Sequence, residues 1–334
     1  MNIPYRTLDD YQPVDIAALR PKGSYGELIR KRTHAIDELV AAHGRIPEDL
    51  LVARHCPTCG SARNRHELDK DHMQLVRCDD CDLVFVHPAF DEQHYREVYA
   101  SKDYQQIMQS LGEASHAYRV ERFGRERVGI VTRHLQAGER PVRYLDVGCS
   151  TGFVVEAARD AGWDAIGIDL NPSAIEFGRN RGLDLRVLAL EEAGFAPGSF
   201  DVVSLFDVLE HLTQPRATLE QVSALLRPGG LLFLYVPNYD SASRMLMGAD
   251  AHFIWPTHHL NYYTPTTIAD LLTRAGLDLA WIATEGLDFV DYLWHLKEVR
   301  HEDASQLEPL ADKLQFLANA GGYGKNLRVL ARKP

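Results

Sequence analysis

The sequence predicts an α/β fold: a doubly wound, mainly parallel sheet preceded by a helical segment and a small cysteine-rich unit. Three observations lead to this prediction. From Arg143 onward, short apolar runs alternate with helix-like segments, which is typical of a parallel sheet with helices on both faces. Four of the five cysteines form two C-x-x-C pairs within residues 56–81. The length of 334 residues allows about two domains.

Composition and charge exclude several classes of protein. The hydrophobic fraction of 45% and the charged fraction of 25% are those of an ordinary globular protein. A net charge of -11 would repel phosphate backbones and anionic lipids, so we expect neither nucleic acid nor a membrane as a partner. No run approaches the roughly 20 apolar residues of a membrane span, and the N-terminus lacks a signal sequence. We therefore expect a cytoplasmic protein.

The regions on either side of the cysteine pairs are expected to be helical. Residues 1–51 are predicted to form an N-terminal helical segment, with a helix from about Tyr25 to His43 that ends before Pro47. Residues 91–140 are charged and aromatic. We expect two or three helices there, which form a linker or lid.

Residues 52–90 are predicted to form a zinc ribbon. The predicted ligands are Cys56, Cys59, Cys78 and Cys81. Two C-x-x-C pairs at this spacing can place four thiolates tetrahedrally around Zn²⁺. A redox C-x-x-C pair or two disulfides are the alternatives, and a reducing cytosol disfavours them. Four cysteines close the coordination shell, so we expect a structural ion and assign no metal to the nearby histidines.

Residues 141–334 are predicted to form the doubly wound domain. Strands are expected in RYLDVG, WDAIGIDL, LDLRVLAL, SFDVVSLFDVLEHL, LLFLYVP, LDLAWIATEG and NLRVLARK. These supply about seven strands, with a helical insertion at about 288–319 before the last strand. The first strand breaks into a glycine turn at Gly148-Cys149-Ser150-Thr151-Gly152. Such turns bind ligands at the carboxyl ends of strands, where a backbone and a helix N-terminus can approach them.

The ligand of this turn is predicted to be nucleotide-like. The turn matches neither G-x-G-x-x-G nor a G-K-[ST] loop, which disfavours dinucleotide and P-loop sites. Asp169 ends the second strand, where a carboxylate can accept two hydrogen bonds from a ribose diol. Its alternative role is to cap the helix that follows.

With these motifs, residues 118–334 resemble the class I S-adenosylmethionine (SAM)-dependent methyltransferases. Five blocks carry the resemblance in order, namely LDVGCSTG, GIDL, GSFDVVSLFDVLEHL, LLRPGGLLFLYVPN and HHLNYYTPTTIADLLTRAG. The resemblance implies a seven-stranded Rossmann-like sheet that binds SAM. Together with the zinc ribbon, it makes the chain similar to sugar and natural-product methyltransferases.

The resemblance also implies which residues bind SAM. Gly148, Cys149 and Gly152 would line its methionine end, with Asp146 near the amino group. Asp169 would bind the ribose, Leu170 and Leu190 would sandwich the adenine, and Phe206 would form the pocket floor. Ala189 stands where an acidic residue often contacts the adenine amine, so backbone groups would have to replace that contact. The lid would carry Tyr95, Tyr99, Tyr104 and Tyr118.

A hydroxyl acceptor needs a base, and histidine suits that task because its pKa is about 6.5. We favour His259, then His258, both in the loop that faces the acceptor in the resembling enzymes, and then His211. Alternatively, these histidines only hold loop backbone. Nearby aromatic residues would form either an acceptor wall or core, namely Tyr235, Tyr239, Phe253, Trp255, Tyr262 and Tyr263.

A second metal site is the least specific expectation. Asp207, Glu210 and His211 form a D-x-x-E-H pattern that is similar to the E-x-x-E-H metal site of ubiquinone-pathway O-methyltransferases. Mg²⁺ would be the ion, although it would need further ligands. The alternative is a helix that Asp207 caps and that packs through Leu209 and Leu212.

These patterns predict an enzyme that transfers the methyl group of SAM to a hydroxyl of a sugar or secondary metabolite. C- or N-methylation of a small molecule is an alternative. A ribbon that delivers the enzyme to nucleic acid is another, disfavoured because acidic residues offset the ribbon's arginines. A catalytically idle scaffold is a third, and the intact glycine turn argues against it.

Overall fold

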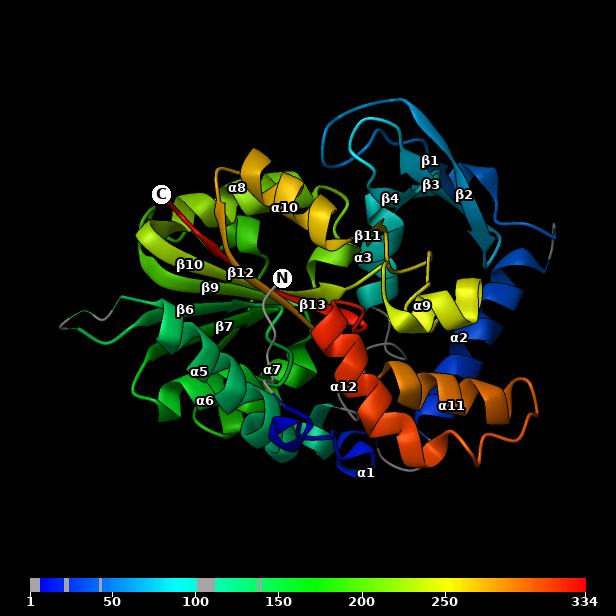
Figure 1. The fold of residues 1–334 in the computed structure, drawn as a ribbon. Coiled ribbons are helices and arrows are strands. Elements are labelled where there is room, and N and C mark those ends of the chain that lie inside the picture. Colours follow the sequence, from blue (N-terminus) through cyan, green and yellow to red (C-terminus); the bar gives the residue numbers. More distant parts are fainter. Residues whose placement is uncertain (1–6, 21–23, 42–43, 101–111, 137, 139) are drawn as a thin grey trace.

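A seven-stranded sheet forms the centre of the computed structural model, which describes residues 7–20, 24–41, 44–100, 112–136, 138 and 140–334 (Figure 1). Its strands are β6 (Arg143–Val147), β7 (Asp164–Asp169), β8 (Asp184–Val187), β9 (Phe200–Phe206), β10 (Leu226–Pro237), β12 (Asp278–Glu285) and β13 (Asn326–Arg332). The strand order is β12-β13-β10-β9-β6-β7-β8. Strand β13 runs antiparallel to both neighbours, and the other pairs are parallel. The predicted fold class is confirmed.

Helices cover both faces of this sheet, as Figure 1 shows. They are α5 (Arg125–His134), α6 (Phe153–Asp160), α7 (Pro172–Asn180), α8 (Pro215–Leu225) and α10 (Pro265–Arg274). Strand β9 packs against both helix layers, because successive side chains of a strand point to opposite faces of the sheet. Val203 and Leu205 pack with α8 and α10, whereas Val202 and Phe206 pack with α5 and α6.

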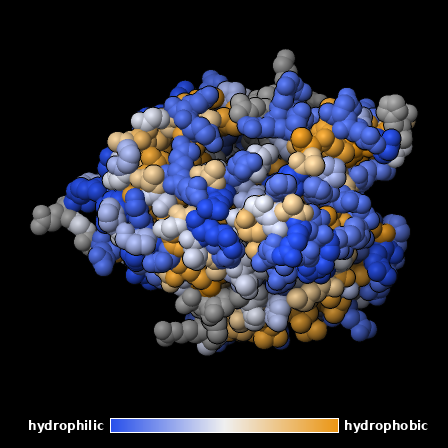
Figure 2. Space-filling view, turned by 90° about the horizontal axis from the view of Figure 1, so that it is seen from above, coloured by the Kyte–Doolittle hydropathy of each residue, from blue (hydrophilic) through white to orange (hydrophobic). Residues whose placement is uncertain are grey.

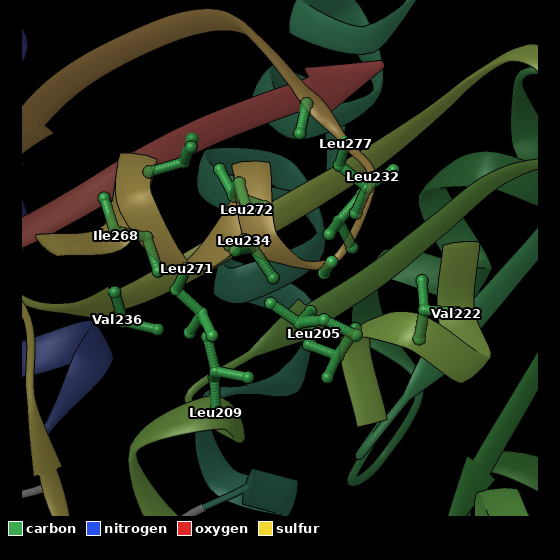
Figure 3. Packing of buried hydrophobic residues seen from close by; sticks show 14 of the residues in the cluster. Leu205, Leu209, Val222, Leu232, Leu234, Val236, Ile268, Leu271, Leu272 and Leu277 are labelled. Carbon is green, nitrogen blue, oxygen red and sulfur yellow. The ribbon is translucent and has the colours of Figure 1, made fainter. Parts of the chain in front are cut away.

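The cluster on the first face is drawn in Figure 3. Leu205 of β9, Val222 of α8 and Leu271 of α10 come together there, and Leu209 joins them from the turn after β9. The close packing of this face holds the carboxyl end of β9 in place, and with it the residues that follow that strand.

The cysteine-rich unit forms a second sheet, which it shares with the rest of the chain. Its strands are β2 (Asn64–Lys70), β3 (Met73–Cys78), β4 (Val84–Val86) and β11 (Asn261–Tyr262), in the order β11-β4-β3-β2. A further pair joins β1 (Leu51–Val52) to β5 (Ala89–Phe90). Because β11 lies far beyond the cysteine-rich unit in the sequence and pairs with β4, this unit is joined by backbone hydrogen bonds to the segment between β10 and α10.

The remaining helices lie mainly in the N-terminal part and in an insertion before β13. They are α1 (Ile16–Leu19), α2 (Ser24–Val40), α3 (Glu92–Ala100), α9 (Ala242–Met247), α11 (Asp288–Glu298) and α12 (Ala311–Gly321). Short helical turns are η1 (Leu8–Asp10), η2 (Glu48–Leu50), η3 (Val120–Gly124), η4 (Leu190–Glu192), η5 (Leu209–His211), η6 (Gly248–Asp250) and η7 (Glu308–Leu310). Helix α11 contacts α9 and α12.

The outer surface is mainly hydrophilic when seen from above, with apolar residues in separate patches (Figure 2). Residues 112–119, which lead into η3, are also helical. Of the tyrosines expected in a lid, Tyr104 and the side chain of Tyr99 lie outside the described residues. Within the part of the chain that the structure describes, none of the helices combines the length and apolar character needed to cross a membrane.

Candidate functional site

The glycine turn after β6 can be made only with glycine at two positions. Gly148 and Gly152 have φ angles of 76° and 78°, a region that other residues rarely adopt. A Cβ atom on Gly148 would lie 2.4 Å from Cγ2 of Val208. The N–H groups of Gly148 and Cys149 donate to the carbonyl of Ile168, at 2.8 and 3.0 Å. The turn is therefore held against the end of β7.

Asp169 stands beside this turn, at the end of β7. Its Oδ2 accepts a hydrogen bond from the N–H of Ser150 at 2.7 Å, and its Oδ1 accepts one from the N–H of Asn171 at 2.8 Å. The helix cap is Asn171, whose side chain accepts from the N–H groups of Ser173 and Ala174. Burial raises the pKa of Asp169. Each carboxylate oxygen has a second lone pair, so the group can still accept hydrogen bonds from a diol.

The residues expected around an adenine differ in exposure. Leu170 is 60% exposed just after the end of β7, so its side chain is accessible to a ligand. Leu190 is buried at the start of η4. Ala189 precedes it, as the sequence indicated, and offers no acidic side chain. The adenine sandwich stays a prediction.

Three other predicted cofactor residues are covered by protein. Asp146 is 2% exposed, and its Oδ1 accepts a hydrogen bond from Ser204 Oγ at 2.6 Å. Burial raises the pKa of Asp146 to about 7. Cys149 is also buried, and burial raises the pKa of its thiol. Phe206 is 8% exposed at the end of β9. Contacts of these side chains with SAM stay predictions.

Arg127, which no sequence motif singled out, packs beside the ends of β9 and β10. Its guanidinium carbon lies 4.1 Å from the ring centroid of Phe206 and 4.8 Å from that of Tyr235. Its Nη1 is buried and has no hydrogen-bond partner among the described residues. The sequence did contain one indication of this position. Arg127 lies four residues before the buried Val131 and therefore on the same face of α5. The arrangement places a cation at the carboxyl ends of β9 and β10.

Two of the three candidate histidines, the first-ranked His259 and the third-ranked His211, meet beyond the end of β9. The ring centroids of His211, in η5, and His259 lie 4.8 Å apart. Nδ1–H of His211 donates to the carbonyl of His258 at 3.0 Å, and Nδ1–H of His259 donates to that of Phe253 at 2.8 Å. Both hydrogen bonds fix the tautomer and leave the lone pair on Nε2. Burial lowers the pKa of His211 to about 4, so it is neutral at neutral pH.

His258 lies beside this pair, in a different setting. Its ring stacks on Trp255 at 3.9 Å between centroids, and its Nδ1 lies 3.1 Å from the Thr257 hydroxyl. Both rings of this stack are half-buried. They therefore form part of the surface next to the histidine pair.

A buried carboxyl group completes this cluster. Glu210 is 1% exposed, and its Oε1 lies 3.9 Å from His211 Nε2. One potential ligand atom from each of Glu210, His211 and His259 lies within 4.8 Å of the others. Asp207 is not in this group; it is exposed, with a φ of 55°. The expected Asp207–Glu210–His211 trio is therefore not brought together, and His259 takes the place of the aspartate.

The alternative role of Asp207, as a helix cap, is also not observed. Val208 occupies the cap position of η5 and makes no side-chain hydrogen bond. Leu209 packs in the core as expected, and Leu212 packs against it. Of the six aromatic residues considered for an acceptor wall, four are core and only Tyr235 and Trp255 are half-buried; the core members are Tyr239, Phe253, Tyr262 and Tyr263.

The four ribbon cysteines converge as predicted. The Sγ atoms of Cys56 and Cys81 lie 3.4 Å apart, and those of Cys59 and Cys78 lie 3.5 Å apart. All four sulfur atoms lie within 4.8 Å of one another, and none forms a disulfide. With Zn–S bonds of about 2.3 Å, tetrahedral thiolates lie about 3.8 Å apart. The cluster therefore fits the size of a four-cysteine zinc site.

The ribbon also contacts both segments that carry the histidines. Arg54 donates from Nη2 to the carbonyl of Thr213 at 3.1 Å and to Asn261 Oδ1 at 3.2 Å. Asn261 in turn donates to the carbonyl of Leu212 at 2.8 Å. The N–H of Val86 donates to the carbonyl of Leu260 at 3.0 Å. Strand β4 and Arg54 thus position the chain on both sides of the histidine pair.

Residues 118–280 match a family described as Methyltransferase domain. Over 150 residues, the chain is 36% identical to ubiquinone biosynthesis O-methyltransferase of Xanthomonas euvesicatoria pv. vesicatoria. That match spans 41% of this chain and 63% of the relative. The same enzyme of Xanthomonas axonopodis pv. citri is 35% identical, with the same coverage. These matches confirm that the chain carries a methyltransferase domain.

Solved structures resemble the chain at low identity. One is a methyltransferase structure from Haloferax volcanii, in complex with the Trm112 activator, at 17% identity and a TM-score of 0.49, covering 68% of this chain and 97% of that chain. Another is 1,6-didemethyltoxoflavin-N1-methyltransferase of Burkholderia thailandensis, solved with S-adenosylhomocysteine, at 15% identity and a TM-score of 0.48, covering 81% and 99%.

Proposed function

We propose that this chain transfers the methyl group of SAM to a hydroxyl of a small molecule, such as a sugar or a secondary metabolite. The observation that carries the proposal is the glycine turn held against β7, with the Asp169 carboxylate beside it. Within a methyltransferase domain, this turn would hold the methionine end of SAM and the carboxylate would hold its ribose diol.

Transfer to oxygen is favoured over transfer to carbon or nitrogen by two observations. The curated relatives are named as O-methyltransferases, although the chain spans only 63% of their length. The histidine cluster also supplies Nε2 lone pairs, one of which can take the acceptor's proton. The acceptor oxygen forms a bond to the methyl carbon, the methyl–sulfur bond breaks, and S-adenosylhomocysteine leaves.

His259 is the preferred base in this scheme, followed by His258. The low pKa of His211 makes it a weak proton acceptor at neutral pH, because a base works best with a pKa near the working pH. The Nδ1–H of His259 is held by a carbonyl, which directs the basic nitrogen away from that loop. Proximity and orientation would supply much of the acceleration.

The four ribbon cysteines are proposed to hold a structural Zn²⁺ ion. Their sulfur separations support this assignment, as does their position in a unit whose strands brace the histidine loop. Delivery to nucleic acid is less favoured, because ribbon arginines pair with acids. Arg65 Nη1 lies 2.7 Å from Asp79 Oδ1, and Arg77 Nη2 lies 2.7 Å from Glu67 Oε1.

A transfer assay with labelled SAM tests the proposal. The purified chain would be incubated with sugar nucleotides, phenols and polyols, and products would be identified by mass spectrometry and by the NMR shift of the new methyl group. We expect an O-methyl product and equimolar S-adenosylhomocysteine. Methyl groups on carbon or nitrogen would support the alternative reaction. A folded chain that binds a pyridine dinucleotide but not SAM would overturn the proposal.

A further inference from the structure

A buried histidine that precedes the central sheet in the sequence forms a hydrogen bond with the glycine turn. His116 is 2% exposed and belongs to the helical residues 112–119. Its Nδ1 lies 2.9 Å from the Thr151 hydroxyl, and its Nε2 lies 2.9 Å from Glu156 Oε2 in α6. We propose that His116 is a positioning residue for the cofactor: through Thr151, it holds the glycine turn in the shape that binds SAM. This role rests on the proposed binding of SAM at the turn.

The hydrogen bonds of His116 have a defined direction. Glu156 accepts hydrogen bonds from Nε and Nη2 of Arg181, at 2.9 and 3.0 Å. These bonds, followed by that from His116, lower the pKa of Glu156 to about 2. An ionised carboxylate can only accept, so Nε2 of His116 carries the hydrogen. Burial lowers the pKa of His116, which keeps the ring neutral at neutral pH. The Thr151 hydroxyl therefore donates to the lone pair of Nδ1.

The turn contains a backbone conformation that needs support. Ser150 has a φ of 50° although it is not glycine, and such conformations persist only when their surroundings fix them. The N–H of Ser150 donates to Asp169 at 2.7 Å, and the side chain of the next residue, Thr151, bonds to His116. Two consecutive turn residues are thus held by two different elements, β7 and helix 112–119. Loss of the His116 bond would remove one of these restraints and let the turn relax.

Close packing keeps the histidine next to the turn. A Cβ atom on Gly112 would lie 3.0 Å from Cγ2 of Thr151, so helix 112–119 contacts the turn at a second point, about one helical turn before His116. The His116 ring also meets that of Phe177, in α7, edge to face with centroids 5.2 Å apart. His116 lies before residues 118–280, which match the methyltransferase domain. A segment upstream of the matched region therefore contributes to the site.

Two amide variants separate the bond to Thr151 from the bond to Glu156. The amide group of asparagine can occupy the place of Nδ1, whereas that of glutamine can occupy the place of Nε2. We expect His116→Asn to bind SAM nearly as well as the wild type. His116→Gln should bind it about five- to tenfold more weakly, the usual effect of losing one neutral hydrogen bond. Isothermal titration calorimetry measures both affinities. A histidine that only supports its own helix would not produce this difference between the two amides.

A second pair of variants tests the same bond from the side of the turn. Thr151→Val removes the hydroxyl, and Thr151→Ser keeps it as the matched control. The valine variant should bind SAM about five- to tenfold more weakly, and the serine variant should differ little from the wild type. Combining His116→Gln with Thr151→Val should weaken binding no further than either change alone, because both changes remove the same bond.

His134→Gln controls for the loss of a histidine from the helices before β6. The Nδ1 of His134 bonds to the carbonyl of Ile130 in the same helix, at 2.9 Å, so this variant should bind SAM as the wild type does. Circular dichroism would show that each variant is folded. Hydrogen exchange measured without SAM should rise in residues 148–152 of His116→Gln and Thr151→Val, and not in the control.

The outcomes decide the proposal in either direction. Weaker SAM binding by His116→Gln and Thr151→Val, with affinity retained in His116→Asn and Thr151→Ser, supports it. Equal affinity of the wild type and His116→Gln would overturn it, as would equal losses in the two amide variants or additive losses in the combined variant. A wild-type chain that binds no SAM overturns the proposed function together with this role. A chain that binds SAM but methylates no hydroxyl overturns only the transfer to oxygen.

Discussion

At the scale of single residues, Asp169 has the most direct bearing on the cofactor. We predict that Asp169→Ala weakens SAM binding at least about tenfold, because charge-assisted hydrogen bonds contribute about 1.5–3 kcal/mol. Isothermal titration calorimetry measures the effect. Asp164→Ala is the matched control, since this aspartate lies exposed at the other end of β7. Equal affinity of the wild type and the Asp169 variant would refute the ribose contact.

Asp146 leads to a prediction about pH. Its pKa is raised from 3.8 to about 7 in the folded chain, so between these values the folded state binds more protons than the unfolded state. The contribution of Asp146 to the stability of the wild type therefore falls as pH rises through this window. Asp146→Asn, which keeps an oxygen for Ser204, should gain stability relative to the wild type, by up to about 4 kcal/mol above pH 7 at 1.36 kcal/mol per pKa unit.

Urea denaturation at pH 5 and pH 8 measures this difference. The advantage of Asp146→Asn should be larger at pH 8, because the wild-type carboxylate is then charged in both states. An advantage that is the same at both pH values would mean that the buried group does not titrate as the structure indicates.

His259 should affect turnover and not the cofactor. We predict that His259→Ala lowers kcat by about 10²–10⁴-fold, the usual effect of losing a general base, while the affinity for SAM changes little. The imidazole lies beyond β9, whereas Asp169 ends β7, two strands away. Steady-state kinetics and calorimetry on the same samples provide the two values. Unchanged turnover would remove His259 from the reaction.

Some site residues are marked by a local sequence pattern, whereas others are defined only by contacts between residues that are far apart in the sequence. The position of Asp169 beside the glycine turn could be predicted because a strand, a glycine turn and an acid follow one another within a short stretch. Arg127 was missed because its packing on Phe206 and Tyr235 joins three elements that are distant in the sequence. The meeting of His211 with His259 and Glu210, in place of Asp207, likewise depends on where the later loop returns to η5.

At the scale of elements, β11 joins the ribbon to the catalytic part. Asn261 is 1% exposed and links Arg54 of the ribbon to the carbonyl of Leu212 beside η5. We predict that Asn261→Ala lowers kcat about tenfold or more, because a 1 Å displacement of reacting groups can cost about 10²-fold. Affinity for SAM should stay the same, so kcat and the SAM dissociation constant are measured together.

Asn64→Ala controls for a general effect of substitutions in the ribbon, since the Asn64 side chain, at the start of β2, donates to the nearby carbonyl of Ala62. If Asn261→Ala lowered SAM affinity as much as turnover, the variant would be generally unfolded. The prediction that only the histidine segments are displaced would then be wrong. The pairing of β11 with β4 could not be predicted, because two residues form too short a strand to carry a periodic signal.

At the scale of the whole molecule, local patterns predicted the layers and tertiary contacts determined how the layers join. Alternation of strands and helices was sufficient for the seven-stranded sheet, and cysteine spacing was sufficient for the cluster of four thiols. Neither pattern predicts that β11 pairs with β4 in a shared sheet. That sheet places the cysteine-rich unit beside the segment that carries His259, so we expect a change in this unit to reach that segment first.

The predicted consequence is a selective loss of order. Cys56→Ser should release zinc from the ribbon and raise hydrogen exchange in residues 52–90 and in β11, because a four-thiolate site contributes folding energy to its own unit. Strands β6 and β7 should remain protected, since their backbone hydrogen bonds are made within the central sheet, although Leu145 and Ile168 share a hydrophobic cluster with Phe85. SAM should still bind while turnover falls. If exchange instead rises equally across β6 and β7, the ribbon and the central sheet form one cooperative unit, and zinc supports the cofactor site as well as the histidine loop.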